Sequence, residues 1–447
     1  MLPEPIPYFP QSYFKANRDA LLALLPDESM VILGGKTETI RNQDTSYPFR
    51  QDSDFEHLTG FLEPDALLVL CKNKTDTTYI LFVNERDPVM ETWNGRRLGP
   101  CGVREQLNVD LSFTLAEIAE QLPKLLSGAK HVYSSIFQTS PNIVNASRLI
   151  KNALKHIHSL ARSGIYPPVN FHDINPLLHQ LRLIKTPLEI QMLKIACDIS
   201  VKAHIAAMQM TRANVMEYQV ASTIHHVFEN HGGTWGYGTI VGGGDNGCIL
   251  HYTQNNQALN TGDLVLIDAG CELHGFTGDI THTYPVSGTM NAAQLAVYEI
   301  VLSALNKATQ ALKVGAAYSD FHNIAVRELT LGLKDLKLLS GDLETLIETN
   351  AYKRFYMHRT GHYLGRDVHD VGRYCSAQDT DILLEDNMVI TVEPGLYIPS
   401  DADIPKEFRG LGIRLEDDVV VMGKTPLNLT AALPRDPNLL KDIIGIY

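Results

Sequence analysis

IDAGCELHGFTGDITHTYP, residues 267–285, joins an apolar run that ends at Asp268 to a β-prone run that begins at Asp279. If the two runs form a hairpin centred between Leu273 and His274, the aspartates lie directly opposite each other, with Cβ atoms about 5 Å apart. Facing carboxylates repel unless a proton or a cation lies between them. The stretch therefore predicts a strand pair with a candidate cation site. For an isolated pair, one solvated aspartate at the loop edge is an equally good interpretation.

Further potential ligands follow or precede strand-like runs later in the chain. Glu393 comes after the apolar run 388–390, and Glu416 comes before the run 419–421. His362 lies in a segment flanked by glycines. Two divalent cations would balance four carboxylates, because charges of +4 and −4 cancel. An oxygen-rich ligand set with a single imidazole suits manganese or a similar ion better than a metal that prefers thiolates.

The first third of the chain has the pattern of an α/β domain. Buried strands are predicted over 66–71 and 78–83, and apolar residues at helical spacing predict a helix over 115–126. Alternating strands and helices favour this fold class. With 447 residues, at ~150 residues per average domain, the chain has room for two or three domains.

Prolines cluster between residues 166 and 176 and mark a linker. We place the domain boundary at Asn175, which gives a first domain over 1–174 and a second over 175–447. The sequence TPLE at 186–189 has the pattern of a helix start, with a capping threonine, a proline in the first turn and a glutamate three residues after the cap. Long helical patterns then extend to residue 208 and over 216–230 and 292–312.

The composition excludes several classes of protein. A formal charge of −13, from 38 basic and 51 acidic residues, repels phosphate backbones, so we expect no nucleic acid partner. The six cysteines contain no CxxC pair, which argues against a disulfide framework and favours a reducing compartment. No apolar run approaches the ~20 residues that span a bilayer, and the first residues do not resemble a signal peptide. We therefore expect a soluble, cytoplasmic protein with no membrane partner.

Four segments of the second half resemble the metallopeptidase family that contains aminopeptidase P, prolidase and methionine aminopeptidase. They are IDAGCELHGFTGDITHTYP, TGHYLGRDVHDVG, TVEPGLYI and GIRLEDDVVV, and they carry the family's Asp, Asp, His, Glu, Glu ligand order. The first half is similar to aminopeptidase P through RNQDTSYPFRQDSDFEHLTGF and TWNGRRLGP. The resemblance implies an α+β chain, in which a smaller α/β domain with a mixed sheet precedes a pita-bread catalytic domain.

The resemblance also implies a site with two metal ions. Asp268 would chelate one ion, Asp279 and Glu416 would bridge both, and His362 and Glu393 would bind the outer positions of the other. A water or hydroxide shared by two ions has a lowered pKa and becomes a nucleophile near neutral pH. It would attack the carbonyl of the first peptide bond, while Glu393 moves the proton to the leaving nitrogen.

Four further residues match the active-site pattern of the family. His251 and His369 would donate hydrogen bonds to the scissile region of the substrate. His358 matches a third active-site histidine. Arg414, two residues before Glu416 and hence on the same strand face, would hold a ligand carboxylate in place.

The resemblance implies an Xaa-Pro aminopeptidase, which releases the first residue of peptides with proline in second position by means of two ions, best matched by Mn²⁺. The amino-terminal domain separates this function from that of methionine aminopeptidase. Two alternatives stay open: prolidase, which would need a group that reads the free carboxylate of a dipeptide, and an inactive pita-bread binding module. Family members are often dimers or tetramers, in which Asp44 and Trp93 are candidates for the rim of a neighbouring cleft.

Overall fold

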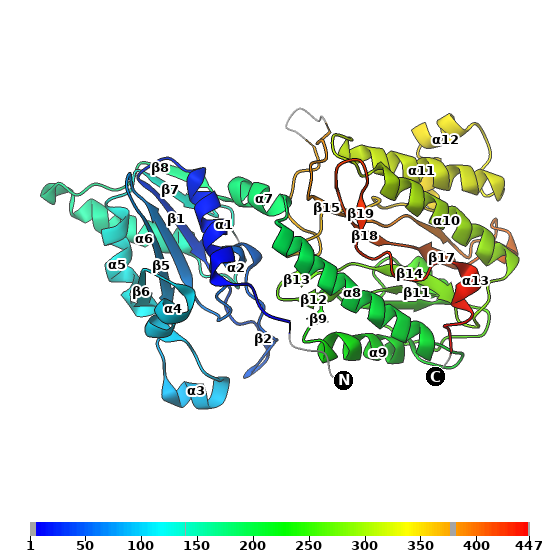
Figure 1. Cartoon of the computed structure of the whole chain (residues 1–447), viewed down its shortest axis with the longest axis horizontal. Coiled ribbons are helices and arrows are strands. Elements are labelled where there is room, and N and C mark those ends of the chain that lie inside the picture. Colours follow the sequence, from blue (N-terminus) through cyan, green and yellow to red (C-terminus); the bar gives the residue numbers. More distant parts are fainter. Residues whose placement is uncertain (1–5, 139, 376–380, 446–447) are drawn as a thin grey trace. The chain divides into compact units, whose positions relative to one another are not determined.

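The computed structural model describes residues 6–138, 140–375 and 381–445 (Figure 1). Contacts between Cα atoms divide the chain into two compact units, one over 7–181 and one that runs from Arg182 onward and includes Ile6. The division falls inside α7 (Asn175–Leu183), whereas the sequence places the domain boundary at the first residue of that helix.

The amino-terminal unit is built on a six-stranded sheet with the order β6-β5-β4-β1-β7-β8. The β1–β4 and β4–β5 pairs are antiparallel and the other three pairs are parallel, so the sheet is mixed, as the family resemblance implies. Its strands are β1 (Ser29–Gly34), β4 (Leu67–Lys72), β5 (Thr77–Val83), β6 (Leu111–Thr114), β7 (His131–Ser134) and β8 (Asn170–Asp173). A separate small hairpin joins β2 (Ile40–Asn42) and β3 (Thr45–Ser46).

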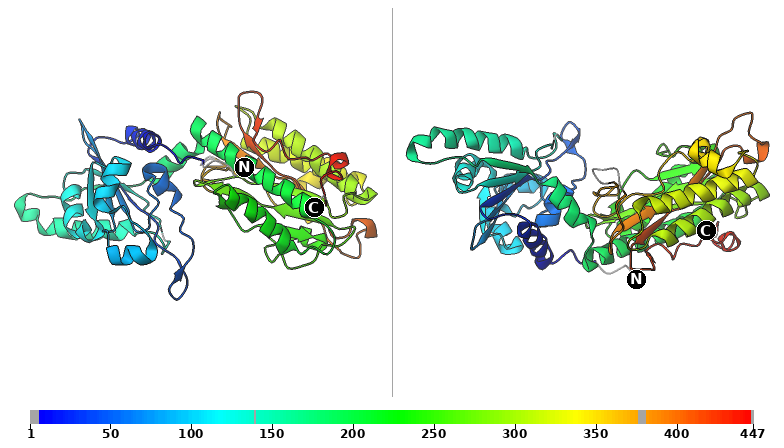
Figure 2. Two further views of the ribbon diagram at one scale, coloured as in Figure 1. Left: turned by 60° about the horizontal axis from the view of Figure 1, so that its bottom comes forward. Right: turned by 90° about the horizontal axis from the view of Figure 1, so that it is seen from above.

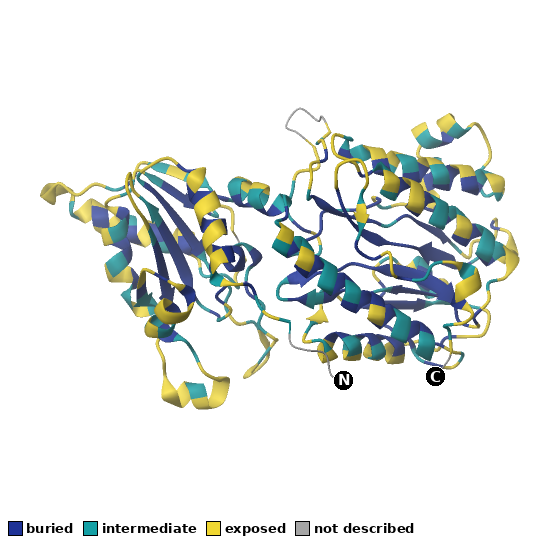
Figure 3. Cartoon of the chain, in the orientation of Figure 1, coloured by how far each residue is buried: buried dark blue, intermediate teal, exposed yellow. Residues whose placement is uncertain are grey.

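Helices cover both faces of this sheet, because successive side chains of a buried strand point to opposite faces. In β4, Leu68 and Leu70 join the core under α1, α2 and α4, while Leu67 and Val69 join the core under α5 and α6. Figure 3 shows the strands buried between half-exposed helices. The helices are α1 (Gln11–Ala23), α2 (Ser53–Thr59), α3 (Pro88–Asn94), α4 (Gly99–Leu107), α5 (Ile118–Leu126) and α6 (Ala146–Ser159).

The predicted elements of the first third agree with this unit. The two predicted strands correspond to β4 and β5, each within one residue of its predicted start. The predicted helix over 115–126 begins with a 3-10 turn over Leu115–Glu117 and continues as α5. Glu117 closes a capping box with Thr114, which explains why the helix starts there.

Two pairs of long helices frame the carboxy-terminal unit, and in Figures 1 and 2 each pair runs side by side. The first pair packs on four short strands, and α10 of the second pair packs on β15 to β18, of which β16 covers Gly395–Ile398. The four short strands are β9 (Thr234–Trp235), β10 (Ile240–Gly243), β12 (Cys271–Leu273) and β13 (Phe276–Thr277). No described helix has both the length and the apolar character that a membrane crossing requires. The helices are α8 (Pro187–Met210), α9 (Glu217–Asn230), α10 (Ala292–Ala311) and α11 (Tyr318–Asp335), followed by the shorter α12 (Leu343–Glu348) and α13 (Pro437–Leu440).

The helix start predicted at 186–189 is confirmed. The backbone N–H of Glu189 donates to the Thr186 hydroxyl at 3.3 Å, and the backbone N–H of Thr186 donates to the Glu189 carboxylate at 2.7 Å. This reciprocal capping box, with Pro187 in the first turn, fixes where α8 begins.

The hairpin of residues 267–285 forms, but its predicted register is wrong. In the pairing of β11 (Leu264–Asp268) with β14 (Thr281–Pro285), the partner of Asp268 is Thr281 and not Asp279. The hairpin turns at His274 and Gly275, whose φ angles are +50° and +75°, as a two-residue turn with two left-handed positions requires. The turn therefore lies one residue later than predicted. The two aspartates are diagonal neighbours on one face instead of direct partners.

A buried ion cluster connects the start of the carboxy-terminal unit to the segment that carries His362 and His369. Asp370 accepts from Arg182 at 2.5 Å and from Lys185 at 3.0 Å, and all three side chains are at least 97% buried. Arg182 also reaches the half-exposed Asp367 at 2.8 Å. Burial raises the pKa of Asp370, but the charges of Lys185 and Arg182 outweigh it and hold that pKa at about 2.

We expect Asp370→Ala to destabilise the protein by about 3–5 kcal/mol, because it removes the buried carboxylate of Lys185 and leaves Arg182 with the half-exposed Asp367. Since the pKa of Asp370 is lowered by folding, its contribution to stability is present above the unfolded pKa near 4 and disappears as the pH falls through about 2. Urea unfolding at pH 7 measures the loss. Asp367→Ala, which removes only the half-exposed partner, should cost under about 1 kcal/mol. Equal losses for the two variants would contradict this interpretation.

Candidate metal centre

The four predicted carboxylate ligands lie at or beside the ends of strands that are distant in sequence. Asp268 ends β11, Asp279 lies just before β14, and Glu393 follows β15 (Val389–Val392). Glu416 lies between β17 (Leu411–Arg414) and β18 (Asp417–Val420). Because β15 pairs with β18 and the backbone N–H of Glu416 donates to the Thr281 carbonyl at 2.9 Å, these strand ends meet at one place.

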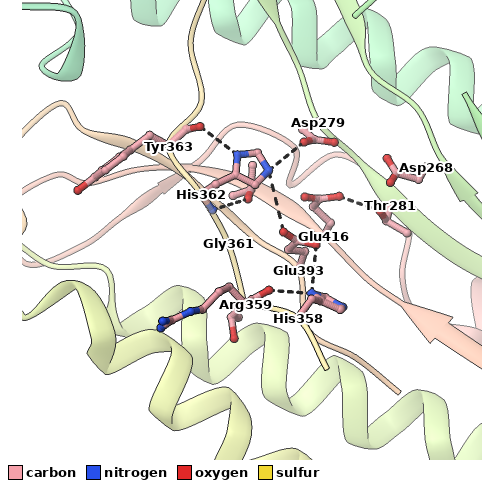
Figure 4. A network of polar contacts seen from close by, with 12 residues as sticks. Asp268, Asp279, Thr281, His358, Arg359, Gly361, His362, Tyr363, Glu393 and Glu416 are labelled. Atoms are coloured by element: carbon pink, nitrogen blue, oxygen red, sulfur yellow. Dashed lines mark hydrogen bonds and ion pairs between the residues drawn. The ribbon is translucent and has the colours of Figure 1, made fainter. Parts of the chain in front are cut away.

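All five side chains line one cavity of about 830 Å³. His362 Nε2 lies 3.4 Å from Asp279 Oδ2 and 4.0 Å from Glu393 Oε1. One potential ligand atom each of Asp279, His362 and Glu416 lies within 4.8 Å of the other two. Figure 4 shows the imidazole and the carboxylates directed toward one another.

Hydroxyl groups orient three of the carboxylates. The Tyr237 hydroxyl lies 2.7 Å from Asp268 Oδ1 and 2.6 Å from Asp279 Oδ1, and so it connects the two diagonal aspartates. The Thr281 hydroxyl donates to Glu416 Oε2 at 2.7 Å. The geometry of the cluster is therefore fixed by neutral hydrogen-bond donors as well as by charge.

Arg414 contacts the cluster from behind, through a side chain that is 4% exposed. Its Nη2 donates to Asp268 Oδ2 at 2.7 Å, its Nε to the Thr281 hydroxyl at 2.9 Å and its Nη1 to the Tyr397 hydroxyl at 2.9 Å. The carboxylate that Arg414 contacts is thus that of Asp268, on a different strand. Arg414 ends β17 and Glu416 lies beyond it, so the two residues do not share a strand.

The three other predicted histidines line the same cavity. His358 Nε2 lies 2.8 Å from the Tyr397 hydroxyl, and His358 Nδ1 lies 3.6 Å from Glu393 Oε2. The ring of His369 lies 4.2 Å from that of His362, measured between centroids. His251 is an exposed residue of the cavity wall. The structure therefore brings every predicted site residue to one cavity.

Burial and like charge make the carboxylates costly to ionise. Burial raises the pKa of Glu416, Asp268 and Glu393, and for each of them the Asp279 charge adds to this effect. Burial lowers the pKa of His362, but the hydrogen bond and charge of Asp279 outweigh it and raise that pKa to about 9. Without a cation, the cluster therefore favours bound protons.

The donor set fits divalent cations. Four carboxylates and one imidazole, crowded and buried, give mainly hard oxygen ligands with a single nitrogen, as manganese and similar ions prefer. Tyr237, Thr281 and Arg414 hold the carboxylates in place from outside the ligand set, as the supporting hydrogen bonds of metal sites do. The positive charge of the ions would relieve the repulsion that raises the pKa values.

Three residues that shape this site are not predicted from the sequence. Tyr237 lies in a glycine-flanked segment 31 positions before Asp268, and no local pattern connects the two. Tyr397 lies in the quoted segment TVEPGLYI, four residues after Glu393, yet its hydroxyl contacts with His358 and Arg414 depend on the fold. Asp418 accepts from the Asp279 backbone N–H at 2.8 Å and from Cys197 Sγ at 3.1 Å, beneath the site.

We expect Asp268→Ala to weaken manganese binding at least about tenfold and to abolish turnover, because the remaining carboxylates hold the cations with one charge fewer. Isothermal titration of metal-depleted protein measures the binding. Asp381→Ala is the matched control, since Asp381 lines the same cavity but bonds to the Ser319 hydroxyl at 2.8 Å. Unchanged manganese affinity in Asp268→Ala would contradict the site.

Comparison with known proteins supports this geometry. Residues 191–422 match the metallopeptidase family M24, and residues 14–133 match the amino-terminal domain of aminopeptidase P. The chain is 43% identical to an Xaa-Pro aminopeptidase of Haemophilus influenzae and 41% identical to that of Escherichia coli. Each alignment spans 433 residues, or 96% of this chain and at least 96% of the relative.

Solved structures of aminopeptidase P also match this chain. The low-pH form of E. coli aminopeptidase P and its complex with the inhibitor Pro-Leu each superpose with a TM-score of 0.94 at 41% identity, over 98% of both chains. These matches confirm the predicted fold class, an α/β amino-terminal domain followed by a pita-bread catalytic domain. The chain belongs to metallopeptidase family M24.

Proposed function

We propose that this protein is a metal-dependent Xaa-Pro aminopeptidase, a metalloexopeptidase that hydrolyses the first peptide bond of peptides with proline in second position. The observation that carries the proposal is the convergence of four acids and one histidine in one cavity. It occurs in a chain that matches Xaa-Pro aminopeptidases over nearly its whole length.

In this proposal two divalent cations are held by Asp268, Asp279, His362, Glu393 and Glu416. Asp279, His362 and Glu416 would hold cations where their ligand atoms come closest, with Asp268 and Glu393 as the further carboxylates of the set. When bound, such ions polarise a substrate carbonyl and lower the pKa of a water nucleophile. Manganese is the ion that we propose, because the donor set is mostly oxygen.

Glu393 is the residue that we propose for proton transfer. Burial raises the pKa of its carboxyl to about 7, with further effects from His362, Arg414 and nearby acids. Bound cations would lower this pKa, so the role rests on position: a carboxylate beside the nucleophile can act first as a base and then as an acid. Glu393 can therefore take the proton from the attacking water and give it to the leaving nitrogen.

We assign the histidines to the substrate. His251 and His369 lie on the cavity wall, where they can donate hydrogen bonds to the scissile region. Burial, aided by the Arg414 charge, lowers the pKa of His358 to about 3, so His358 is neutral at pH 7 and its ring orientation is set by Tyr397. Arg414 is a positioning residue, since it contacts Asp268 and Tyr397.

Prolidase is the second candidate function, because the same metal site would serve a dipeptide. Its substrate carries a carboxylate on the proline itself, so a cation would have to lie close to the metal ligands. Arg414 is buried and already paired with Asp268, so it does not supply this cation. An inactive binding module is the third candidate, but all five ligands are present here.

A cleavage assay on Ala-Pro-Ala and Gly-Pro distinguishes these functions. We expect the purified, manganese-loaded protein to release alanine from Ala-Pro-Ala at a rate at least tenfold above that for glycine from Gly-Pro, since the amino-terminal half matches aminopeptidase P. Chromatographic analysis of the released amino acids gives both rates. Cleavage of the dipeptide alone would identify a prolidase, and cleavage of neither peptide would support a binding module.

A reconstitution series tests the metal. Chelator treatment should remove activity, and Mn²⁺ should restore more of it than Mg²⁺, Ca²⁺ or Zn²⁺, because four carboxylates and one imidazole match a hard ion that also accepts nitrogen. Activity of each reconstituted sample, with metal content by mass spectrometry, gives the ranking. The highest activity with Zn²⁺ at equal occupancy would replace manganese in the proposal.

The proposal also includes the oligomeric state and the cellular location of the protein. We propose a homodimer or homotetramer in which Asp44 and Trp93 of a neighbouring subunit border the cleft. Trp93 is 81% exposed on α3, where a tryptophan is available for contact with another chain. A cytoplasmic location accords with the six free cysteines.

A further inference from the structure

We infer that Arg359 binds a substrate carboxylate located beyond the scissile bond, and so makes the enzyme prefer peptides with negative charge after the proline. The inference rests on the proposed peptidase function and adds a specificity residue to its site. The carboxylate can be the carboxy terminus of a short peptide or an acidic side chain of a longer one.

Arg359 lies inside the site but points away from the metal ligands. It lines the cavity together with its chain neighbours His358 and Thr360, and its backbone carbonyl contacts His358 Nδ1 at 2.7 Å. In Figure 4 its guanidinium extends away from the carboxylates of Asp268 and Glu416. A ligand of this guanidinium would therefore lie at some distance from the bond that is cleaved.

Among the described residues, the Arg359 guanidinium has no hydrogen-bond or ion-pair partner in the cavity wall. Two guanidinium groups line the cavity. Arg414 is buried and donates to Asp268, Thr281 and Tyr397. Arg359 is exposed, and within the described parts of the chain its guanidinium makes no hydrogen bond or ion pair. Its side chain therefore has its full donor capacity for a ligand.

The surroundings of Arg359 form the part of the cavity next to α11. His322, Tyr318 and Phe321 of α11 line this wall, and His322 Nδ1 lies 2.8 Å from the Thr360 hydroxyl. Burial lowers the pKa of His322 to about 4, and the charges of Arg359 and Lys353 add to this shift. His322 is thus neutral at pH 7, and Arg359 is the cation at this wall.

The chemistry of the proposed substrate provides a matching anion. Cleavage after the first residue leaves proline and everything beyond it on one side of the metal ligands. In a tripeptide that side ends in a carboxylate. A guanidinium presents parallel N–H groups that match the two oxygens of a carboxylate, so the pair can be bidentate. An exposed pair of this kind adds modest affinity but clear selectivity.

The test compares charged and uncharged forms of one substrate. The substrates are Ala-Pro-Ala, its carboxy-terminal amide, and the amide of Ala-Pro-Glu, and the proteins are the wild type, Arg359→Ala and Arg359→Lys, all loaded with manganese. We expect the wild type to favour the free acid over its amide by about three- to tenfold in kcat/KM, mostly through KM. Arg359→Ala should lose this preference and keep the rate on the amide.

The other arms identify the source of the carboxylate. Faster cleavage of the Ala-Pro-Glu amide than of the Ala-Pro-Ala amide, in the wild type only, shows that a side chain can supply it; equal rates assign it to the peptide terminus. Arg359→Lys should keep part of the preference, because it retains the charge without the planar fork. Arg354→Ala is the matched control, since Arg354 pairs with Asp401 and Asp403 and does not line the cavity.

Two outcomes would overturn the inference. Equal kcat/KM of the wild type for all three substrates would show that no carboxylate is read. A parallel loss on both substrates in Arg359→Ala, with unchanged thermal stability, would show that Arg359 serves the site in another way. Cleavage of the amide in either case leaves the proposed function intact, whereas cleavage of none of the three substrates would count against that function.

Discussion

Mutual repulsion between buried carboxylates is the constraint on which this site depends. Asp268, Asp279, Glu393 and Glu416 converge from strand ends in one cavity, and burial and like charge oppose their ionisation. Such crowding is stable only with protons or cations between the oxygens. The carboxylates stay close in spite of this repulsion, because paired strands fix the backbone beneath each acid.

The supporting residues keep the acids in place without neutralising them. Tyr237 and Thr281 donate through neutral hydroxyls, so they orient oxygens and leave the charge for a cation. Arg414 is the exception, and among the candidate ligands it donates a hydrogen bond only to Asp268. Beneath them, Asp418 fixes the Asp279 backbone. The rigidity of the site thus comes from hydrogen bonds that a metal does not replace.

The sequence predicts the elements well and the contacts between them less well. The capping box at α8 and the strands β4 and β5 follow from local patterns, and the ligands follow from the family resemblance. The hairpin register was wrong, because the two left-handed positions at His274 and Gly275 fall one residue beyond the midpoint of the aspartates. Tyr237 could not be found, since only the folded chain brings its hydroxyl to both aspartates.

The hydrogen bonds also separate the four acids by role. Asp268 and Asp279 share the single Tyr237 hydroxyl at 2.7 and 2.6 Å, and Glu416 accepts from the Thr281 hydroxyl at 2.7 Å. Among the described residues, Glu393 has no such donor: His358 and His362 approach its oxygens only to 3.6 and 4.0 Å. A carboxylate held by such donors is fixed in its orientation, whereas one without them is freer to turn between partners. This difference supports the role in proton transfer that we propose for Glu393.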